Sequence, residues 1–203
     1  MSEDHTGLAG IFDVDLQWTA ESSVAAILRA VRRLIVAFVM CLSATALVAE
    51  SAAGLHWTAP VGWKAGPPQM MRAATYAVAA ASGDTASSEC VVYFFGAGQG
   101  GSVDANIERW KGQFTNAGKP AAAAVSKRTA RGIPMTTIDV AGEYSGLGGP
   151  MAASKPVAGY RLLGAIVEGP GGNIFVKFTG PAKTIAANKA KYDALLASFA
   201  KDE

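Results

Sequence analysis

The glycine-rich segment 96–101 is the part of the sequence whose spacing is most typical of a functional motif. Gly96, Gly98 and Gly101 match the pattern G-x-G-x-x-G, and the segment follows an apolar run and precedes a predicted helix. In dinucleotide-binding proteins such glycines let the backbone approach a pyrophosphate at the N-terminus of the helix. The spacing therefore makes 96–101 a candidate nucleotide-binding loop.

The surroundings of this segment favour a mechanical role for its glycines. Asp104 falls in the first turn of the predicted helix, where its carboxylate competes with a phosphate for the same N–H groups. The strand that follows ends in Ser126, Lys127 and Arg128, whereas a dinucleotide site needs an acidic residue there for the ribose. We therefore expect a sharp strand-to-helix turn and no cofactor, with a nucleotide-binding module as an alternative.

Other residues with catalytic chemistry are sparse. His56 is the single histidine of residues 54–203, and no nucleophile-elbow pattern accompanies it. The sequence of the same region has no cysteine pair, histidine pair or carboxylate cluster at metal-ligand spacing. We therefore predict no catalytic residue and no metal site. The rival hypothesis is an enzyme of unknown class, such as a hydrolase, that uses His56 or Glu143 with Ser145.

The predicted recognition surface combines the glycine-rich segment with a second loop and nearby aromatic residues. Segment 143–159 is rich in glycine, proline and alanine, and loops of this length are often functional. Trp57 and Trp63 flank a predicted turn, where they either line a ligand groove or cap the edge of the core. The candidate surface residues are Gly98, Gln99, Gly100, Gly101, Ser102, Tyr144, Trp57 and Trp63.

The N-terminal part of the chain has the features of an export leader. Three arginines precede the apolar run 34–43, and small residues follow that run. This is the order of a secretory signal peptide, which we assign to 24–53. Cleavage after Ala46 fits the small-residue rule best, and cleavage after Ser51 or Ala53 is the alternative.

The predicted leader determines where we expect the protein to act. Residues 1–23 have no convincing periodicity, and we interpret them as a non-native or disordered extension that results from the choice of start codon. Once the leader is removed, the protein is expected to be periplasmic or secreted. Contact with the membrane is expected only through the apolar run, if that run stays uncleaved as an anchor.

The rest of the chain, 54–203, is predicted to be a single domain. Apolar and β-branched patterns predict strands at 55–60, 70–80, 89–95, 122–129, 135–142, 160–168 and 173–179. The fourth and fifth of these strands are expected to form one hairpin, and the last two a second hairpin across a glycine-rich turn.

Two helices are predicted from an apolar period of 3.6 residues. Val103, Ile107, Trp110 and Phe114 share one face of the first helix, and Ser102 is its expected N-cap. The second helix opens at Gly180-Pro181, and its apolar face consists of Ile185, Tyr192, Leu195, Leu196 and Phe199. Because the helices separate groups of strands, we expect an α+β fold with an antiparallel sheet of about six or seven strands, flanked by two main helices.

The composition excludes several classes of protein. The chain has 203 residues, of which 50% are hydrophobic, and a formal net charge of +2, so one domain can bury an ordinary core. Lys127, Arg128 and Arg131 form the one tight basic cluster of the predicted domain, without a stripe of stacking aromatic residues. We therefore expect no nucleic acid partner. Cys90 stands in an apolar strand and is expected to be a small buried residue.

Several segments together resemble a group of uncharacterised exported bacterial proteins. They are Trp57-x-x-Pro60-x-x-Trp63, Met71-Arg72-x-Ala74, the segment 95–103 with Arg109-Trp110, and the segment 160–168. The order of strands and helices is similar to the PsbP-like α/β/α sandwich, named for an extrinsic subunit of photosystem II. The resemblance covers 54–199; it implies a fold but no reaction and no catalytic residues.

These observations favour a binding protein over an enzyme. We expect an exported, non-enzymatic binding or accessory protein of the cell envelope, with an unknown protein or small molecule as its partner. Its recognition surface is predicted at the glycine turn 96–103 together with the loop 143–159.

Overall fold

The computed structural model describes residues 49–146 and 155–203, which belong to a compact unit that begins at Leu47. Predictions for 1–23, for 24–48 and for the part of the loop at 147–154 lie outside the described residues. The elements are, in chain order, β1 (Ala49–Ala52), β2 (Leu55–Thr58), β3 (Lys64–Ala65), β4 (Arg72–Val78), β5 (Ser88–Phe94), α2 (Val103–Lys111), β6 (Phe114–Asn116), β7 (Lys119–Pro120), β8 (Ala123–Ala130), β9 (Ile133–Tyr144), β10 (Val157–Gly169), β11 (Gly172–Pro181), α3 (Ala182–Ala187), α4 (Lys189–Ser198) and β12 (Ala200–Lys201).

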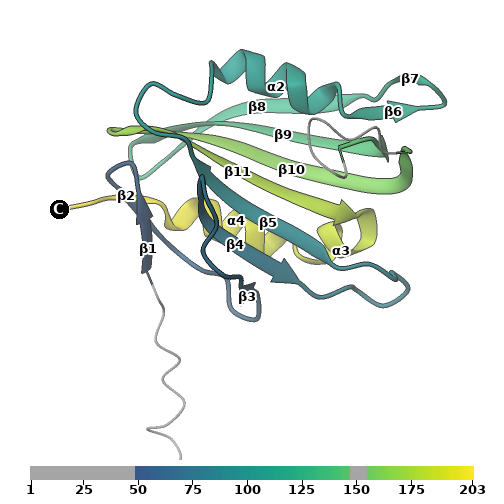
Figure 1. Cartoon of the computed structure of the whole chain (residues 1–203), viewed down its shortest axis with the longest axis horizontal. Helices are drawn as coiled ribbons and strands as arrows, with labels where there is room; N and C mark the ends of the chain where they lie inside the picture. Colours follow the sequence, from purple (N-terminus) through teal and green to yellow (C-terminus); the bar gives the residue numbers. More distant parts are fainter. Residues whose placement is uncertain (1–48, 147–154) are drawn as a thin grey trace, which may run out of the picture. The chain divides into compact units, whose positions relative to one another are not determined.

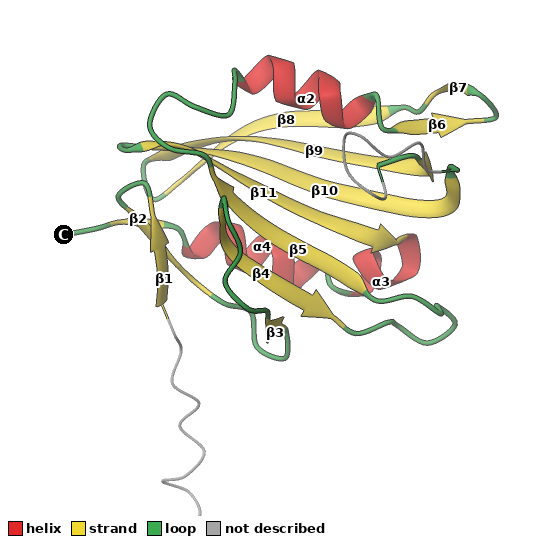
Figure 2. Cartoon of the chain, viewed as in Figure 1, coloured by secondary structure: helices red, strands yellow, loops and turns green. Residues whose placement is uncertain are grey.

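The strands of the described chain form one large sheet and one small sheet, and all their pairings are antiparallel (Figure 2). The large sheet has nine strands in the order β3-β4-β5-β11-β10-β9-β6-β7, with β8 also paired to β9. The small sheet has the order β1-β2-β12. The large sheet is therefore an antiparallel meander around β9, β10 and β11, as the two predicted hairpins require.

The central strands are buried on both faces of the large sheet, which explains their nearly continuous apolar sequences. In β10, Leu162 and Ile166 belong to the core under α2, whereas Leu163, Ala165 and Val167 belong to the core under α3 and α4. Figure 1 shows α2 on one side of the sheet and α3 with α4 on the other. The described domain is thus a layered α/β/α arrangement, which confirms the α+β class.

Helix α2 lies close to the sheet because one position of β10 has no side chain. A Cβ atom on Gly164 would lie 2.6 Å from Cζ3 of Trp110, which is too short for any side chain. Trp110 and Ile107 are buried in this contact. Ser102 caps the helix as predicted, since its Oγ accepts a hydrogen bond from the backbone N of Ala105 at 3.2 Å.

The large sheet has more strands than the six or seven that the sequence predicted. The additional strands β3, β6 and β7 have two or three residues each, so they are too short to produce an alternating pattern. Phe114 was expected on the face of the first helix, but the helix ends at Lys111 and Phe114 begins β6. Its burial is nevertheless as expected, because β6 packs into the same core.

The last predicted helix is divided into α3 and α4 at Asn188, so the described chain has three helices rather than two. Pro181 ends β11 and precedes α3, instead of being its first residue. All five residues of the predicted apolar face are buried as expected.

Nowhere in 49–146 or 155–203 does a helix combine the length and apolar character needed to cross a bilayer.

Residues 49–53, which we placed at the end of the leader, are part of the fold. β1 pairs with β2 over four residues, and Glu50 accepts a hydrogen bond of 2.5 Å from the hydroxyl of Tyr76. The carbonyl of Ala53 accepts a hydrogen bond of 2.8 Å from the backbone N of Gly171. The folded unit therefore includes residues that a cleavage after Ser51 or Ala53 would remove.

Candidate functional site

A cavity of about 680 Å³ lies on the α2 side of the large sheet; we name it the α2-face cavity. Its floor consists of facing residues of two paired strands, since Phe175, Lys177 and Thr179 of β11 oppose Tyr93, Val91 and Glu89 of β5. Because side chains alternate along a strand, one register brings all six to the same face. Residues of α2 and of the ends of β9 and β10 complete the walls.

The α2-face cavity is lined both by aromatic rings and by polar side chains. The aromatic residues are Tyr93, Phe95, Trp110, Tyr144, Tyr160 and Phe175. The polar side chains are Arg72, Ser87, Ser88, Glu89, Arg109, Gln113, Ser145, Lys177 and Thr179. The lining is therefore mixed, and the volume of the cavity falls within the range of small-molecule sites.

Lys177 is the buried cation of this cavity. Its Nζ donates hydrogen bonds to Oε1 of Gln113 at 2.9 Å and to the hydroxyl oxygen of Tyr144 at 3.0 Å. Burial, reinforced by the nearby charge of Arg109, lowers the pKa of Lys177 to about 8. Burial also raises the pKa of Tyr144 to about 12, so its hydroxyl stays protonated beside the amine.

The cavity carries more positive than negative charge. Arg72 pairs with Glu89 through a contact of 2.8 Å between Nη1 and Oε1, and its guanidinium lies 5.6 Å from the centre of the Tyr93 ring. Within the described chain, neither Lys177 nor Arg109 forms an ion pair. The Arg109 guanidinium instead donates to the amide oxygen of Asn106. Two positive charges therefore face the cavity without a carboxylate partner.

One hydroxyl group on the floor of the cavity, Oγ1 of Thr179, is buried without a hydrogen-bond partner among the described residues. A buried hydroxyl without a partner costs free energy, so such groups mark places where a bound molecule can be recognised.

The glycine-rich segment packs against this cavity but forms a turn, not a phosphate cradle. A Cβ atom on Gly100 would lie 2.7 Å from the ring of Phe175 and 2.8 Å from that of Phe95. The carbonyls of Gly100 and Ser102 accept hydrogen bonds from the Asn106 side chain. The strand before the segment, β5, has antiparallel neighbours on both sides. The parallel unit that a dinucleotide site requires is therefore absent around β5.

The structure divides the predicted recognition surface. Gly98, Gln99, Gly100, Gly101 and Ser102 lie in the loop before α2, on the same side of the sheet as Tyr144. Tyr144 lines the cavity, with its ring stacked on that of Tyr160 at 5.7 Å. The glycine-rich residues do not line the cavity themselves, and their role in recognition stays a prediction.

The two tryptophans of the predicted surface belong to the core on the opposite side. Trp57 is 0% exposed and its Nε1 donates to the hydroxyl of Tyr76 at 2.9 Å. Trp63 is 8% exposed and its Nε1 donates to Oδ1 of Asn188 at 3.2 Å. Both tryptophans therefore belong to the core and do not line a ligand groove, which corrects their assignment to the recognition surface.

The residues of the rival enzyme hypothesis have separate partners. His56 lies in the small sheet, with Nδ1 3.0 Å from Oδ1 of Asp202. Glu143 and Ser145 lie at the end of β9, where Thr115 donates to Glu143 at 3.4 Å and Ser145 donates to the carbonyl of Gln113 at 3.2 Å. His56 and Glu143 therefore belong to different sheets.

Cys90 is fully buried, as expected, and burial raises the pKa of its thiol.

Sequence reasoning missed the charged residues of the cavity. Lys177 interrupts an apolar strand between Val176 and Phe178, and a lysine inside such a strand is a signal of a buried cation. Arg72, Glu89 and Arg109 gave no comparable signal, because only the strand register and the position of α2 bring them to Lys177. Across 49–146 and 155–203, no group of three or more His, Cys, Asp or Glu residues could hold a metal ion.

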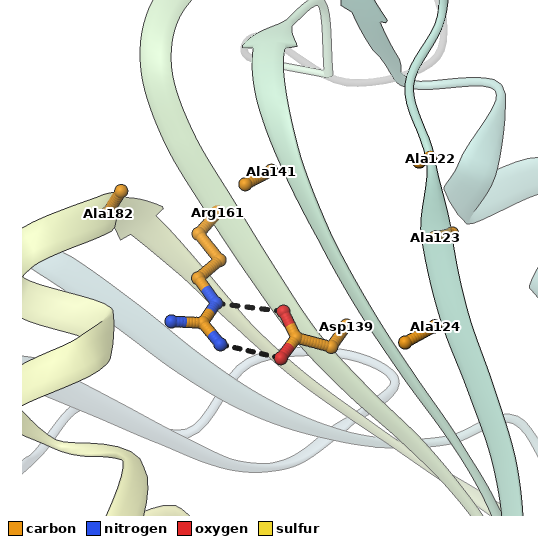
Figure 3. Close-up of a pocket in the computed structure, with 7 residues that line it drawn as sticks. All are labelled: Ala122, Ala123, Ala124, Asp139, Ala141, Arg161 and Ala182. Carbon is orange, nitrogen blue, oxygen red and sulfur yellow. Dashed lines mark hydrogen bonds and ion pairs between the residues drawn. The ribbon is translucent and has the colours of Figure 1, made fainter.

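A second hollow lies on the other side of the large sheet. A groove of about 560 Å³ is lined mainly by alanines of β8, β9 and α3 and by the adjoining Ala122. Figure 3 shows Arg161 and Asp139 inside it, joined by two parallel hydrogen bonds. Nε of Arg161 donates to Oδ1 at 2.8 Å and Nη2 donates to Oδ2 at 2.6 Å. This ion pair satisfies both charges.

No protein-family model matches the chain, and no curated protein matches it. Several solved structures are similar to it, among them the following two. The solution structure of the cyanobacterial PsbP protein CyanoP from Synechocystis has 10% identity and a TM-score of 0.46, over 76% of this chain and 90% of that one. The crystal structure of a protein of unknown function from Pseudomonas aeruginosa has 10% identity and a TM-score of 0.45, over 77% of this chain and 97% of that one. The first of these structures belongs to the PsbP-like group that the sequence resembles.

Proposed function

We propose that this protein is an exported, non-enzymatic binding protein of the cell envelope, and that it binds a small anionic molecule in the α2-face cavity. The proposal of export rests on the sequence of the leader, most of which lies outside the described residues. The proposal of binding rests on the cavity itself, which has the size of a small-molecule site.

The observation that carries the proposal is the uncompensated charge of Lys177. Burial of an ammonium group without a carboxylate partner lowers the stability of the folded protein by roughly several kcal/mol, unless a bound anion supplies the counter-charge. Gln113 and Tyr144 supply neutral hydrogen-bond acceptors but no negative charge. An anionic ligand would supply that charge, and Arg109 would add a second cation.

The aromatic walls favour a ligand with a flat or apolar body. Tyr144 and Tyr160 stack with their rings 11° from parallel, and Tyr93 and Phe95 stack with an angle of 8°. Such rings offer a large apolar area with polar edges. Thr179 adds a hydroxyl group that can bind a polar substituent of the ligand.

A thermal-shift screen tests this function. Aromatic and aliphatic carboxylates and phosphates are compared with their neutral amides or alcohols, using the wild type, Lys177→Met, and Lys119→Met as an exposed control. We expect one group of anions to raise the Tm of the wild type and of Lys119→Met, and to have no effect on Lys177→Met. Equal stabilisation of all three proteins, or no stabilisation by any anion, would contradict the proposal.

The pH dependence of binding provides a second test. An anion beside Lys177 favours the ammonium form, so the bound protein holds its proton to higher pH than the free protein. Affinity for an anion that binds here should therefore fall as the pH rises above about 8. Titration calorimetry across that range measures this decrease, and an affinity that does not change with pH would exclude contact with Lys177.

A further inference from the structure

The side of the large sheet that faces α3 and α4 contains another polar cavity. It has a volume of about 270 Å³ and lies between the hairpin of β8 and β9 and helix α4. Arg128 of β8 and Tyr192 of α4 both line it. It lies on the opposite side of the sheet from Lys177, so a ligand here would bind independently of one in the α2-face cavity.

Three hydrogen-bond donors in this cavity have no acceptor among the described residues. They are Nε and Nη2 of Arg128 and the hydroxyl of Tyr192. Tyr192 is 3% exposed, and although 37% of the Arg128 side chain is exposed, these two nitrogens are buried. Buried donors are nearly always satisfied in folded proteins, so three together in one cavity require an explanation.

The neighbouring Arg161 indicates which chemical group would satisfy Arg128. Arg161 uses its Nε and Nη2, the two donors of one guanidinium edge, to bind both oxygens of the Asp139 carboxylate. Arg128 presents the same pair of atoms without an acceptor. This edge matches a carboxylate in shape and charge, since its two N–H groups are parallel.

The carboxylates that line the cavity are already paired with other cations. Asp139 is held by Arg161, and Asp193 accepts a hydrogen bond of 2.6 Å from Nζ of Lys189. The closest approach of Asp193 to Arg128 is 3.9 Å, and it involves Nη1, which is not one of the unpartnered atoms. Asp193 therefore faces two cations, Lys189 and Arg128, and the Nε–Nη2 edge of Arg128 has no carboxylate.

The cavity adjoins the alanine-lined groove, since Ala124 and Asp139 line both. The groove has small apolar side chains, including Ala124, Ala141 and Ala182. A ligand whose charged end lies at Arg128 can therefore extend a short apolar chain along it.

We infer that Arg128 and Tyr192 form a second binding site, which takes the carboxylate of a short aliphatic acid. Arg128 donates two parallel hydrogen bonds to the carboxylate and Tyr192 donates a third. The apolar chain of the acid lies against the alanines of the groove.

Nuclear magnetic resonance tests this inference directly, because the Nε–H group of an arginine gives its own signal. The ¹⁵N-labelled protein is titrated with butyrate, and in parallel with butyramide, which has a similar shape but no charge. We expect butyrate to shift the Nε–H signal of Arg128 in a saturable manner, and butyramide to leave it unchanged.

Variants separate recognition from a general effect of charge. Arg128→Lys keeps the charge but loses the paired donors, so butyrate should bind it about tenfold more weakly or worse, and Tyr192→Phe several-fold more weakly. Arg131→Gln, in the nearby turn, should bind as the wild type does.

Tyr192→Phe should also raise the Tm without ligand, because it removes an unpartnered buried hydroxyl. An unshifted Arg128 signal, equal shifts from butyramide, or unaltered affinity of Arg128→Lys would overturn the inference.

Discussion

Lys177 is the residue whose environment departs most from that of its type. It stands opposite Val91 in the centre of the sheet, with Val176 and Phe178 on either side in sequence. Lysine is rarely buried without a carboxylate partner, because the transfer of its charge from water into the protein costs free energy. The folded protein bears this cost at neutral pH, and the cost must appear in its stability.

The first prediction concerns the stability of Lys177→Met as a function of pH. The unfolded chain takes up the lysine proton below its ordinary pKa of 10.5, whereas the folded protein does so only below about 8. Between these values the unfolded state binds more protons, so wild-type stability rises with pH and the cost is fully present below pH 8. The advantage of Lys177→Met should shrink by about 3 kcal/mol between neutral pH and pH 10.5.

Urea denaturation of both proteins at several pH values provides this measurement. Comparison with the variant cancels the titration of the tyrosines, which the two proteins share. A difference in the free energy of unfolding that stays constant across the range would mean that Lys177 is not desolvated.

The second prediction concerns Gly100, where φ is +88° and a Cβ atom would overlap Phe95 and Phe175. Gly100→Ala should destabilise the protein by about 2–4 kcal/mol, because strain in the left-handed region adds to overpacking. Gly98 is the matched control, since its φ is +70° and nothing lies within 4 Å of its Cβ position. Gly98→Ala should therefore cost only about 1–2 kcal/mol. Equal losses in the two variants would show that the loop does not rest on the aromatic rings.

At the scale of elements, helix α2 forms one wall of the α2-face cavity and supplies Arg109 and Trp110. The cap at Ser102 fixes where the helix begins, and Gly164 lets Trp110 reach the sheet. The position of the cavity therefore depends on local features that the sequence contains.

The third prediction concerns that cap. Ser102→Ala removes the acceptor for the backbone N of Ala105 and should lower the free energy of unfolding by about 1 kcal/mol. Ser102→Asp keeps an acceptor and adds a negative charge at the N-terminus of the helix, so it should retain wild-type stability. Thermal unfolding of both variants checks this, and a loss of equal size in Ser102→Asp would show that the cap does not stabilise α2.

The sequence predicted the long elements well because each has a strong local pattern. The hairpins, β5 and α2 all follow from apolar periodicity, and Arg131-Gly132 forms the tight turn between β8 and β9. The break at Asn188 was missed because the apolar face continues across it. At the break, the Asn188 side chain accepts a hydrogen bond from a distant residue, Trp63, and donates one to the carbonyl of Thr184. Short strands and long-range partners of this kind have no local signature.

The candidate site was predicted in part for the same reason. Tyr144 was identified from its own segment, whereas the cluster around Lys177 requires the register of β5 on β11. Trp57 was misplaced on the surface because a tryptophan beside a predicted turn has the same local sequence whether it is buried or exposed. Burial is a property of the assembled layers, which no single segment determines.

At the scale of the whole molecule, the folded unit includes β1. Glu50 of β1 is the acceptor for Tyr76, and burial together with Glu50 raises the pKa of the Tyr76 phenol. Tyr76 in turn accepts a hydrogen bond from Trp57 in the core. Loss of β1 would leave this buried chain of polar groups without its final acceptor.

The fourth prediction therefore concerns both processing and stability. We expect the protein to be exported and cleaved after Ala46, which would leave β1 intact, and mass spectrometry of a secreted or periplasmic product would identify this end. A chain that begins at residue 54 should be less stable than one that begins at residue 47, by at least about 1–3 kcal/mol for the hydroxyl of Tyr76 alone. Glu50→Gln in the longer chain is the control for the loss of charge. A mature end at residue 52 or 54 would contradict the expectation.

The small sheet has a further consequence for the order of folding. β2 lies between β1, which is close to it in sequence, and β12, which is far from it: His56 contacts Asp202 across 146 positions. Contacts between such distant positions form slowly, because a long intervening stretch must first be ordered. During synthesis or translocation from the N-terminus, β2 has one bare edge until β12 emerges. Over that interval the nascent polypeptide exposes a surface on which chaperones can act and at which two incomplete copies can wrongly pair.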